Sequence, residues 1–363
     1  MDTGTAKNAY SKVDTGIVGL GNIGHYHAER LRDIGGSLVG GMDISSDAQT
    51  RFERRYGVPV YDDHQELFDR ADAVVITTPN KFHEEYATDA LERDLHVLIE
   101  KPLAHTLESA ERIAAAASST DSVCVVGFNN RFANTVRILR ARIEAGELGE
   151  LTHVEANYVR RRGVPGRGTW FTRRAIAGGG ALIDLGVHAI DLGLYLFDFP
   201  SVEEVSGVTR STFGPREDYA YLEMWGVDAG PEGFDVDDSA SAFVRCGADR
   251  TLSLEVAWAT NRPATHEFVV HGTDAAATFD LLDRNLSIYS ASQAGTPHLE
   301  DSTIQTAEND THTDELRAFL EAITTGSVSH DNVAEGLEVQ RVVDAIYRSG
   351  DSGRTVRLDS DSE

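Results

Sequence analysis

The sequence predicts an α/β protein of two domains, in which an N-terminal doubly wound parallel sheet precedes a C-terminal α+β domain with a large, mostly antiparallel open sheet. A chain of 363 residues is long for one hydrophobic core. Residues 13 to 126 alternate short β-branched runs with amphipathic stretches, which is typical of βαβ units. Later strand-like runs follow one another with only turns between them. We expect domains at residues 1–130 and 131–363.

The expected parallel sheet is built from short apolar segments. Each is separated from the next by a stretch with helical periodicity, so that helices cover both faces of the sheet. The segments are TGIVGL (15–20), SLVGGMD (37–43), ADAVVITTP (71–79), LHVLIE (95–100) and SVCVVGF (122–128).

The second half of the chain has a different pattern. Helices are expected at about 133–145, 313–325 and 332–348, and loops at 290–312 and after Leu358. The expected strands of the antiparallel sheet are SASAFVRC (239–246), RTLSLEVAWAT (250–260), HEFVVHGTDAAATFDL (266–281) and NLSIYS (285–290).

The chain is strongly acidic, with a formal net charge of -26. Phosphates would be repelled, so we expect neither nucleic acid nor an anionic membrane as a partner. Lysine occurs only at positions 7, 12, 81 and 101, so arginine supplies nearly all the positive charge. This composition is typical of salt-loving organisms, in which intracellular salt screens the self-repulsion. The polar first fourteen residues and the lack of a long apolar run predict a soluble, cytoplasmic protein.

A glycine-rich turn follows the first expected strand. Gly19, Gly21 and Gly24 stand in G-x-G-x-x-G spacing, directly after an apolar strand and at the start of a helix. Glycines permit a tight turn and the close approach of a pyrophosphate, whose charge the helix N-terminus stabilises. The sequence therefore predicts a dinucleotide-binding Rossmann domain, with Asn22 and Ile23 in the same turn.

Asp43 ends the second expected strand, where a carboxylate holds the ribose hydroxyls of a dinucleotide. A carboxylate beside a 2′-phosphate would cost on the order of several kcal/mol at short range. Ile44 and Ser45 offer no arginine to offset that repulsion, although Arg51 or Arg54 could fold back. We predict NAD as the cofactor and expect NADP to be less favoured.

Lys101 follows the strand segment 95–100, at the carboxyl end of the sheet, where doubly wound folds bind ligands. It is the last lysine of a chain that otherwise uses arginine, and an amine, unlike a guanidinium, can exchange a proton. The alternative is a surface lysine at a strand end.

Residues 178–197, GGGALIDLGVHAIDLGLYLF, predict a glycine hinge that leads into a long apolar helix. Asp184 and His188 are spaced i, i+4 and share one face, and Asp191 lies close to it. Such groups are costly on a buried helix unless they are partnered or line a cavity. An imidazole beside a carboxylate can exchange protons near neutral pH, although a satisfied core histidine is the alternative. We expect the glycines to let the backbone approach a ligand.

These motifs together resemble the Gfo/Idh/MocA oxidoreductases, a family that includes glucose-fructose oxidoreductase and inositol dehydrogenase. The resemblance spans nearly the whole chain and implies hydride transfer between NAD and a hydroxyl or keto carbon of a sugar, glycoside or cyclitol. The motifs that carry it are GLGNIG (19–24), TTPNKFH (77–83), EKP (100–102), GFNNRF (127–132) and GGGALIDLGVHAIDL (178–192).

The resemblance also implies roles for individual residues. Lys101, Asp184 and His188 match the catalytic trio: His188 or Lys101 serves as the principal acid/base, and Asp184 orients the substrate. Asp191 falls at a non-catalytic position, and Asn130 departs from the arginine of many relatives. The residues implied around the nucleotide are Thr78, Pro79, Asn80, His83, Glu100 and Lys101, although the 77–83 stretch could instead only cap a helix.

An arginine-rich stretch, residues 158–174, precedes the apolar helix. It could receive an anionic or bulky glycoside substrate, with Trp170 stacking on a sugar face. We name Arg131, Arg167 and Trp170 as candidate substrate contacts. The alternative is that these arginines pair with the abundant acidic residues.

Other functions remain open at this stage. The chain could be a glycosidase that uses bound NAD for transient oxidation and elimination, or a non-catalytic NAD-sensing regulator. A metalloenzyme using Asp184, His188 and Asp191 is disfavoured, because no second histidine stands at ligand spacing on that helix. We expect no metal site. As in many members of the family, the open sheet face is expected to form a homodimer or homotetramer.

Overall fold

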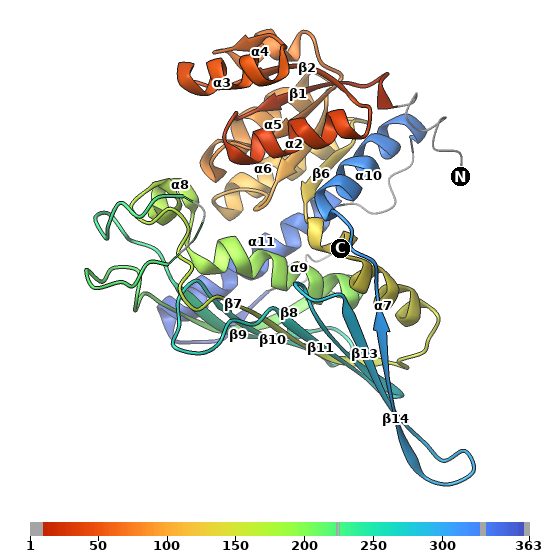
Figure 1. Cartoon of the computed structure of the whole chain (residues 1–363). Helices are drawn as coiled ribbons and strands as arrows, with labels where there is room; N and C mark the ends of the chain where they lie inside the picture. The colour runs from red at the N-terminus through yellow and green to blue at the C-terminus, as the bar shows by residue number, and fades with distance from the viewer. Residues whose placement is uncertain (1–9, 223, 225, 327–331, 359–363) are drawn as a thin grey trace. The chain divides into compact units, whose positions relative to one another are not determined.

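The computed structural model describes residues 10–222, 224, 226–326 and 332–358. The chain forms two compact units (Figure 1): Met1–Asn129 with Asp310–Glu338, and Asn130–Asn309 with Val339–Glu363. The segment Asp310–Glu338 thus belongs with the first unit, although it lies inside the range 131–363 assigned to the second domain from the sequence.

The first unit contains a six-stranded sheet in the order β3-β2-β1-β4-β5-β6, and every neighbouring pair is parallel. The order reverses between β1 and β4, so the carboxyl ends of these two strands mark the place where doubly wound folds bind ligands. The predicted doubly wound sheet is confirmed. Its strands are β1 (Asp14–Val18), β2 (Ser37–Met42), β3 (Val60–Tyr61), β4 (Ala73–Ile76), β5 (His96–Glu100) and β6 (Cys124–Gly127).

The helices of the first unit include α10 (Thr311–Thr325), which comes from the far end of the chain. This helix packs against α2 and β6. Its side chains Leu316, Phe319 and Leu320 are buried in one cluster with Ile17 and Leu31, which explains why Asp310–Glu338 belongs to this unit. The helices are α2 (Asn22–Asp33), α3 (Ser46–Tyr56), α4 (His64–Phe68), η1 (Asn80–Phe82), α5 (His83–Glu92), α6 (Leu107–Ser118) and α10 (Thr311–Thr325).

The second unit is built on a nine-stranded sheet in the order β14-β13-β12-β11-β7-β10-β9-β8-β15. All its pairs are antiparallel except β7 with β10, which confirms the predicted mostly antiparallel sheet. The strands are β7 (Leu151–Val159), β8 (Val202–Arg210), β9 (Ser239–Cys246), β10 (Arg250–Ala257), β11 (Glu267–Gly272), β12 (Ala275–Asp280), β13 (Asn285–Ser292), β14 (His298–Gln305) and β15 (Val356–Arg357).

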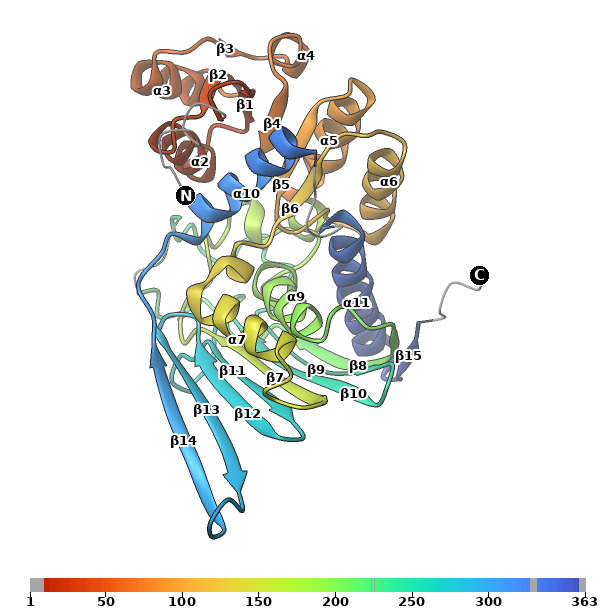
Figure 2. The same cartoon turned by 90° about the vertical axis from the view of Figure 1, so that its right-hand side faces the viewer.

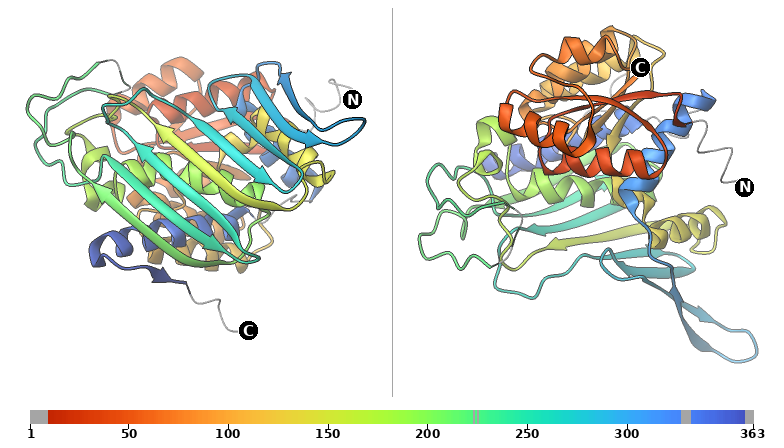
Figure 3. Two further views of the ribbon diagram at one scale, coloured as in Figure 1. Left: turned by 90° about the horizontal axis from the view of Figure 1, so that it is seen from below. Right: turned by 45° about the horizontal axis from the view of Figure 1, so that its top comes forward.

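Helices of the second unit cover one face of this sheet. Helix α9 (Val187–Leu196) packs on β7 and β10, and at Gly193 an added Cβ would lie 2.8 Å from the side chain of Leu252. Figure 3 shows the opposite face, over which no helix of the described residues of this unit runs. The remaining helical elements are η2 (Asn129–Phe132), α7 (Asn134–Glu144), η3 (Trp170–Thr172), α8 (Arg174–Ala177), η4 (Leu182–Gly186) and α11 (Asn332–Ser352). The first residue of η2 and the part of α11 up to Glu338 belong to the first unit.

The expected local structure differs from the observed structure at several places. Residues 290–312 were expected to be a loop, but β13 continues to Ser292 and β14 follows at His298–Gln305. These strands form a hairpin that extends beyond the rest of the sheet (Figure 2), and β14 is exposed almost throughout, so it lacks the apolar alternation that marks a strand. Strand β8 was missed, and α11 runs past Gly350 to Ser352.

The helical stretch Arg174–Leu196 is long and apolar enough, by composition alone, to cross a membrane. Within the structure, however, 78% of its apolar window is buried. A buried core helix passes the same test of length and composition, so this stretch is weak support for a membrane span.

Candidate functional site

The glycine turn of the first unit lies between β1 and α2. Gly19 has a φ of +96°, and a Cβ there would lie 2.9 Å from the backbone of Thr77 and Thr78. At Gly24 a Cβ would lie 2.0 Å from the carbonyl oxygen of Gly19. A side chain is therefore excluded at both positions by the protein's own backbone.

Gly21 differs from its two neighbours in the motif, because a Cβ added there would meet no atom of the described structure within 4 Å. It is the N-cap of α2, has no side-chain cap, and no acidic residue follows in the first turn. Gly21, Asn22 and Ile23 are all exposed. The first amides of the helix and its dipole are thus available to an anion, as a dinucleotide pyrophosphate requires.

Asp43 follows β2 and is fixed by two backbone amides. Its Oδ2 accepts a hydrogen bond from Leu20 N at 2.8 Å, and its Oδ1 accepts one from Ser45 N at 2.8 Å. A carboxylate has about four lone-pair positions, so further acceptor sites remain for ribose hydroxyls. The bond to Leu20 holds this carboxylate against the glycine turn.

The segment after β4 is joined to the glycine turn by Thr77, whose hydroxyl donates to the carbonyl of Gly19 at 2.6 Å. The next hydroxyl, Oγ1 of Thr78, is buried and has no hydrogen-bond partner among the described residues. A buried hydroxyl without a partner is costly, and a bound ligand can satisfy it. Pro79 and the buried Asn80 follow directly.

His83 connects two loops of the first unit. Its Nε2 lies 2.9 Å from the carbonyl of Thr78, and its Nδ1 lies 2.9 Å from the carbonyl of Pro102. Burial lowers the pKa of the imidazole, although its backbone hydrogen bonds oppose that shift. Both ring nitrogens thus face the protein's own backbone. The geometry thus gives His83 the role of holding Thr78 in place. The sequence had suggested instead that His83 contacts the nucleotide itself.

Glu100 ends β5 immediately before Lys101. Its carboxylate lies 2.6 Å from Nε2 of the fully buried His27. Burial would raise the pKa of Glu100, but the hydrogen bond from His27 and the nearby charges of His27, His312 and Lys101 bring it to about 2. Burial lowers the pKa of His312 to about 4. Sequence reasoning missed both histidines, because only folding brings α10 to α2.

The observations on the first unit fit a dinucleotide. Gly21, Asn22 and Ile23 offer helix amides to a pyrophosphate, Asp43 offers oxygens to a ribose, and Thr78 offers a buried hydroxyl. The residues of the sequence-predicted cofactor site therefore lie along one edge of the parallel sheet, with His83 behind them.

In the second unit, the glycine run 178–180 is closed by the protein itself. A Cβ at Gly179 would lie 1.9 Å from the hydroxyl of Tyr347, and one at Gly180 would lie 1.8 Å from the carbonyl oxygen of Asp237. The expectation that these glycines let the backbone approach a ligand is corrected. They let the backbone approach Asp237 and Tyr347.

Asp184 lies in η4, a π-helical turn that leads directly into α9. Its Oδ2 accepts a hydrogen bond from Nε1 of Trp258 at 2.8 Å and lies 3.7 Å from Nη1 of Arg160. Sequence reasoning expected a regular α-helix here. Wide turns of this kind are frequent at functional sites, because they change the direction of individual side chains.

His188 lies in the first turn of α9 and is 8% exposed, as is Asp184. The ring of Tyr158 has its centroid 6.2 Å from that of His188, and the ring of His266 lies edge-on to Tyr158 at 4.5 Å. Tyr158 and Arg160 are two residues apart at the carboxyl end of β7, so they continue one face of the sheet. Tyr158, Arg160, Trp258 and His266 are neighbours of the catalytic candidates that sequence reasoning did not name for that role.

Asp191 has a different partner from Asp184 and His188. Its carboxylate accepts hydrogen bonds from Nε of Arg131 at 3.1 Å and from Nη2 of the same residue at 2.5 Å, and the pair is almost fully buried. Removing one member would leave an uncompensated buried charge. The suggested substrate contact of Arg131 is therefore corrected to an internal ion pair with Asp191 of α9.

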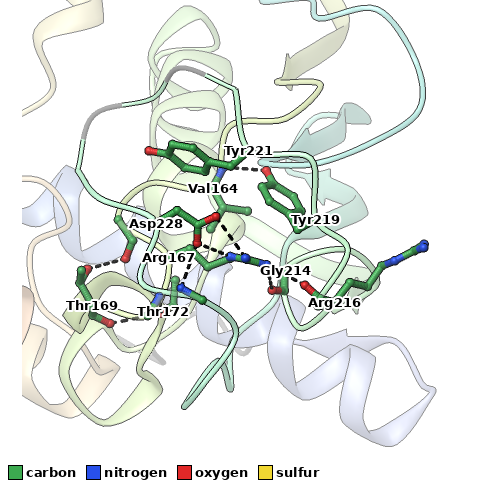
Figure 4. Close-up of polar contacts among 12 residues, drawn as sticks. Val164, Arg167, Thr169, Thr172, Gly214, Arg216, Tyr219, Tyr221 and Asp228 are labelled. Carbon is green, nitrogen blue, oxygen red and sulfur yellow. Dashed lines mark hydrogen bonds and ion pairs between the residues drawn. The ribbon is translucent and has the colours of Figure 1, made fainter.

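Arg167 is held in the same way (Figure 4). Its guanidinium donates to Asp228 at 2.7 and 3.1 Å, to the carbonyl of Arg216 at 2.7 Å and to that of Gly214 at 3.3 Å. The residue is 4% exposed. Its expected substrate contact is corrected to the bracing of the long loop between β8 and β9. The sequence left open the alternative that these arginines pair with acidic residues of the protein, and Arg167 does so.

Trp170, the third candidate substrate contact, stacks on Phe171 with ring centroids 3.7 Å apart. One face of its indole is thereby covered, and the side chain is only half-buried. Its role in substrate binding stays a prediction. Among the residues the structure describes, no group of three His, Cys, Asp or Glu side chains is arranged to hold a metal ion.

Comparison with known proteins decides the family. The chain matches the oxidoreductase family with an NAD-binding Rossmann fold over residues 13–128, and the GFO/IDH/MocA C-terminal domain over residues 136–278. It is 30% identical over 317 residues to D-glucoside 3-dehydrogenase of Escherichia coli (strain K12), with 86% of this chain and 87% of that protein covered. The chain belongs to the GFO/IDH/MocA oxidoreductase family.

Other known proteins are similar to the chain over most of their length. The chain is 27% identical over 351 residues to scyllo-inositol 2-dehydrogenase (NAD(+)) of Bacillus subtilis (strain 168), covering 93% of this chain and 95% of that one. The solved structure of levoglucosan dehydrogenase with NADH and levoglucosan superposes on this chain with a TM-score of 0.82 at 24% identity. The match covers 96% of this chain and 100% of that chain. The predicted oxidoreductase activity and the predicted cofactor NAD are confirmed for this GFO/IDH/MocA protein.

Proposed function

We propose that this oxidoreductase transfers hydride between NAD and a secondary hydroxyl or keto carbon of a sugar, glycoside or cyclitol, using Lys101, Asp184 and His188. The observation that carries the proposal is the glycine turn that is open at Gly21 in the first unit. In the second unit, Asp184 in η4 and His188 in α9 are both buried, with 8% of each exposed, and supply a carboxylate and an imidazole. The named dehydrogenases that the chain resembles act on substrates of this class.

Bound NAD supplies the acceptor or donor for the hydride. On the chain's side, His188 takes the proton from the substrate hydroxyl during oxidation, and Lys101 hydrogen-bonds the same oxygen and stabilises its growing negative charge. Asp184 is kept in place by Trp258 and by the charge of Arg160, so it can accept a second substrate hydroxyl and set the orientation of the sugar. In the reductive direction His188 returns the proton.

We test the proposal by mixing the purified protein with NAD and, in turn, methyl glucoside, levoglucosan, glucose 6-phosphate, D-xylose, myo-inositol and scyllo-inositol. Formation of NADH with one of these, and its loss in His188→Asn, is expected. Turnover that persists unchanged in His188→Asn would contradict the assigned chemistry. Retention of NAD through purification, with glycoside cleavage and no net NADH, would support the glycosidase alternative instead.

We further propose that the protein acts in the cytoplasm, at high salt and as a homodimer or homotetramer. The net charge of -26 supports the salt requirement. The uncovered face of the nine-stranded sheet supports oligomerisation, because it carries the exposed side chains of Phe243, Tyr289 and Val208. Light scattering and thermal unfolding in dilute buffer and in molar KCl measure both properties.

A further inference from the structure

A short acidic strap, residues Asp235–Asp238, lies between the long β8–β9 loop and β9. Each of its three aspartates accepts backbone amides from a different segment. Asp235 accepts from Arg174 N at the start of α8, and Asp238 accepts from Gly214 N at 2.9 Å. Asp237, in the middle, is directed at the segment that leads into the catalytic candidates. In a chain with so many acids, two of these aspartates are not solvent-facing charges: Asp237 and Asp238 are buried, whereas Asp235 is exposed.

Asp237 holds the start of η4 with both carboxylate oxygens. Its Oδ1 accepts from Gly180 N at 2.9 Å, and its Oδ2 accepts from Leu182 N at 2.8 Å. Its own carbonyl accepts from Ala181 N at 3.0 Å. Three successive amides, only two to four residues before Asp184, are therefore fixed by one residue of the strap.

Tyr347, from α11, completes this arrangement. Its hydroxyl donates to Oδ1 of Asp237 at 2.7 Å, and the guanidinium of Arg174 lies 5.1 Å from its ring centroid. The pKa of Tyr347 is raised by burial and by the neighbouring Asp237. Gly179 and Gly180 have no room for a Cβ because the Tyr347 hydroxyl and the Asp237 carbonyl occupy that space. The glycine run, the strap and α11 thus fit together as one unit of packing.

We propose that Asp237 and Tyr347 are positioning residues for Asp184 and His188. They fix the position and the rotation of the start of the helix, and they thereby orient the side chains that hold and deprotonate the substrate. This inference rests on the proposed function of Asp184 and His188. We assign neither residue a reaction with the substrate: Asp237 is buried, Tyr347 is partly buried, and the hydroxyl of Tyr347 donates to the carboxylate of Asp237. Their effect on the reaction is indirect and passes through the backbone of residues 180–182.

The structure specifies how each variant acts. In Asp237→Asn one oxygen becomes an amide donor, so Gly180 N and Leu182 N can no longer both be accepted. In Tyr347→Phe the ring and its contact with Arg174 remain, and only the hydroxyl is lost. Small displacements of reacting groups lower turnover strongly while leaving binding nearly intact. We expect kcat to fall roughly tenfold in Asp237→Asn and about threefold in Tyr347→Phe, with the KM for the sugar changed less than twofold.

Asp235→Asn is the matched control. It changes an aspartate of the same strap that accepts a backbone amide, but the amide belongs to α8 and the side chain is exposed. All three variants are compared with the wild type and with His188→Asn, using NAD and the sugar that the substrate panel identifies. The measurements are kcat, KM, the primary deuterium isotope effect on kcat and NADH binding by fluorescence, well below each melting temperature.

A positioning role predicts a lower kcat and a larger isotope effect in Asp237→Asn and Tyr347→Phe, unchanged NADH affinity, and wild-type kinetics in Asp235→Asn. Wild-type kcat and isotope effect in both folded variants, with His188→Asn inactive, would overturn the inference and leave the proposed function standing. A fully active His188→Asn would instead overturn the proposed function. If Asp237→Asn does not fold, Tyr347→Phe, which removes one hydroxyl, decides the matter by the same measurements.

Discussion

The molecule contains two glycine-rich turns, each at the start of a helix, and the structure gives them opposite roles. At Gly21, in the first unit, an added Cβ would meet nothing within 4 Å, and the helix start has no side-chain cap. At Gly180, in the second unit, the corresponding space is filled by the carbonyl oxygen of Asp237, and the helix start is capped by its carboxylate. The backbone amides of the first turn are available to a ligand, whereas those of the second turn are hydrogen-bonded to the protein itself. Glycine in a motif therefore indicates close approach without saying what approaches.

The largest effect is expected at Lys101. This residue follows β5 at the carboxyl edge of the parallel sheet in the first unit, outside the glycine turn. Lys101→Arg keeps the positive charge and a hydrogen-bond donor but cannot exchange a proton near neutral pH. We expect kcat to fall on the order of 10²-fold, the contribution typical of general acid–base catalysis. Stopped-flow kinetics over a range of pH measures it. Lys101→Arg with wild-type kcat would leave His188 as the only acid/base.

The second turn is tested by Gly180→Ala. Because the new Cβ would lie 1.8 Å from backbone, which cannot rotate away, we expect the free energy of unfolding to fall by about 3 kcal/mol, the upper part of the range for overpacking. Urea unfolding measures the change. Wild-type stability in Gly180→Ala would show that the strap is not closed against the glycine run.

Acid sensitivity tests two titratable groups of the first unit, His312 and Glu100. The pKa of His312 is about 4, below its ordinary 6.5, so the unfolded chain takes up a proton first and stability falls as pH drops from about 6.5 to about 4. Glu100, with a pKa of about 2, supplies stability that is present above about 4.5 and is lost between about 4.5 and 2. We expect His312→Gln to remove roughly 3 kcal/mol of the loss in the upper window. We expect it also to narrow the lower window, because the charge of His312 is one of the causes that lower the pKa of Glu100.

Thermal unfolding of both proteins at each pH measures this difference. The comparison cancels the contribution of Asp237, whose pKa is raised by burial and which therefore titrates in the opposite sense. Parallel pH profiles for the wild type and His312→Gln would contradict the uncharged state of His312 in the folded protein.

The prediction at Asp43 has a smaller effect. Asp43→Ser removes the charge that opposes a 2′-phosphate but keeps an acceptor for the amide of Leu20 or Ser45. We expect the ratio of NADPH to NADH affinity to rise about tenfold, which corresponds to about 1.4 kcal/mol. Parallel fluorescence titrations measure it, with Asp47→Ser, on the neighbouring helix α3, as a control. An unchanged ratio would mean that Asp43 does not face the ribose.

The sequence was sufficient for features whose cause is local. The strand–turn–helix at Gly19–Gly24, the carboxylate at Asp43 and the apolar helix with His188 each depend on spacing within a few residues or on a known order of strands. The order of segments also separated the two sheets: strand-like runs alternate with helical stretches in the parallel sheet and follow one another directly in the antiparallel sheet. Strand β14 was not predicted because almost all of its side chains are exposed, so its sequence lacks the alternation of apolar and polar residues that marks a strand.

The rest of the site depends on partners distant in the chain. Arg131 and Arg167 looked available because an arginine in a sequence does not show which acid it pairs with, and Asp191 and Asp228 lie about 60 residues away from them. The cap at Asp237 was hidden for the same reason: in a chain of net charge -26, one more acid looks like surface. The π-helical turn at η4 follows from tertiary contacts that periodicity cannot represent.

The most direct test of the account is an NADH titration of the wild type and of Gly21→Ala, followed by nicotinamide or tryptophan fluorescence in molar KCl. Because a methyl group at Gly21 meets only open space in the protein, melting temperature should be unchanged, while the Kd for NADH should rise several-fold as the methyl group enters the space of the pyrophosphate. Equal NADH affinity in the two proteins, or no binding by folded wild type, would contradict the claim that the open glycine turn is the cofactor site.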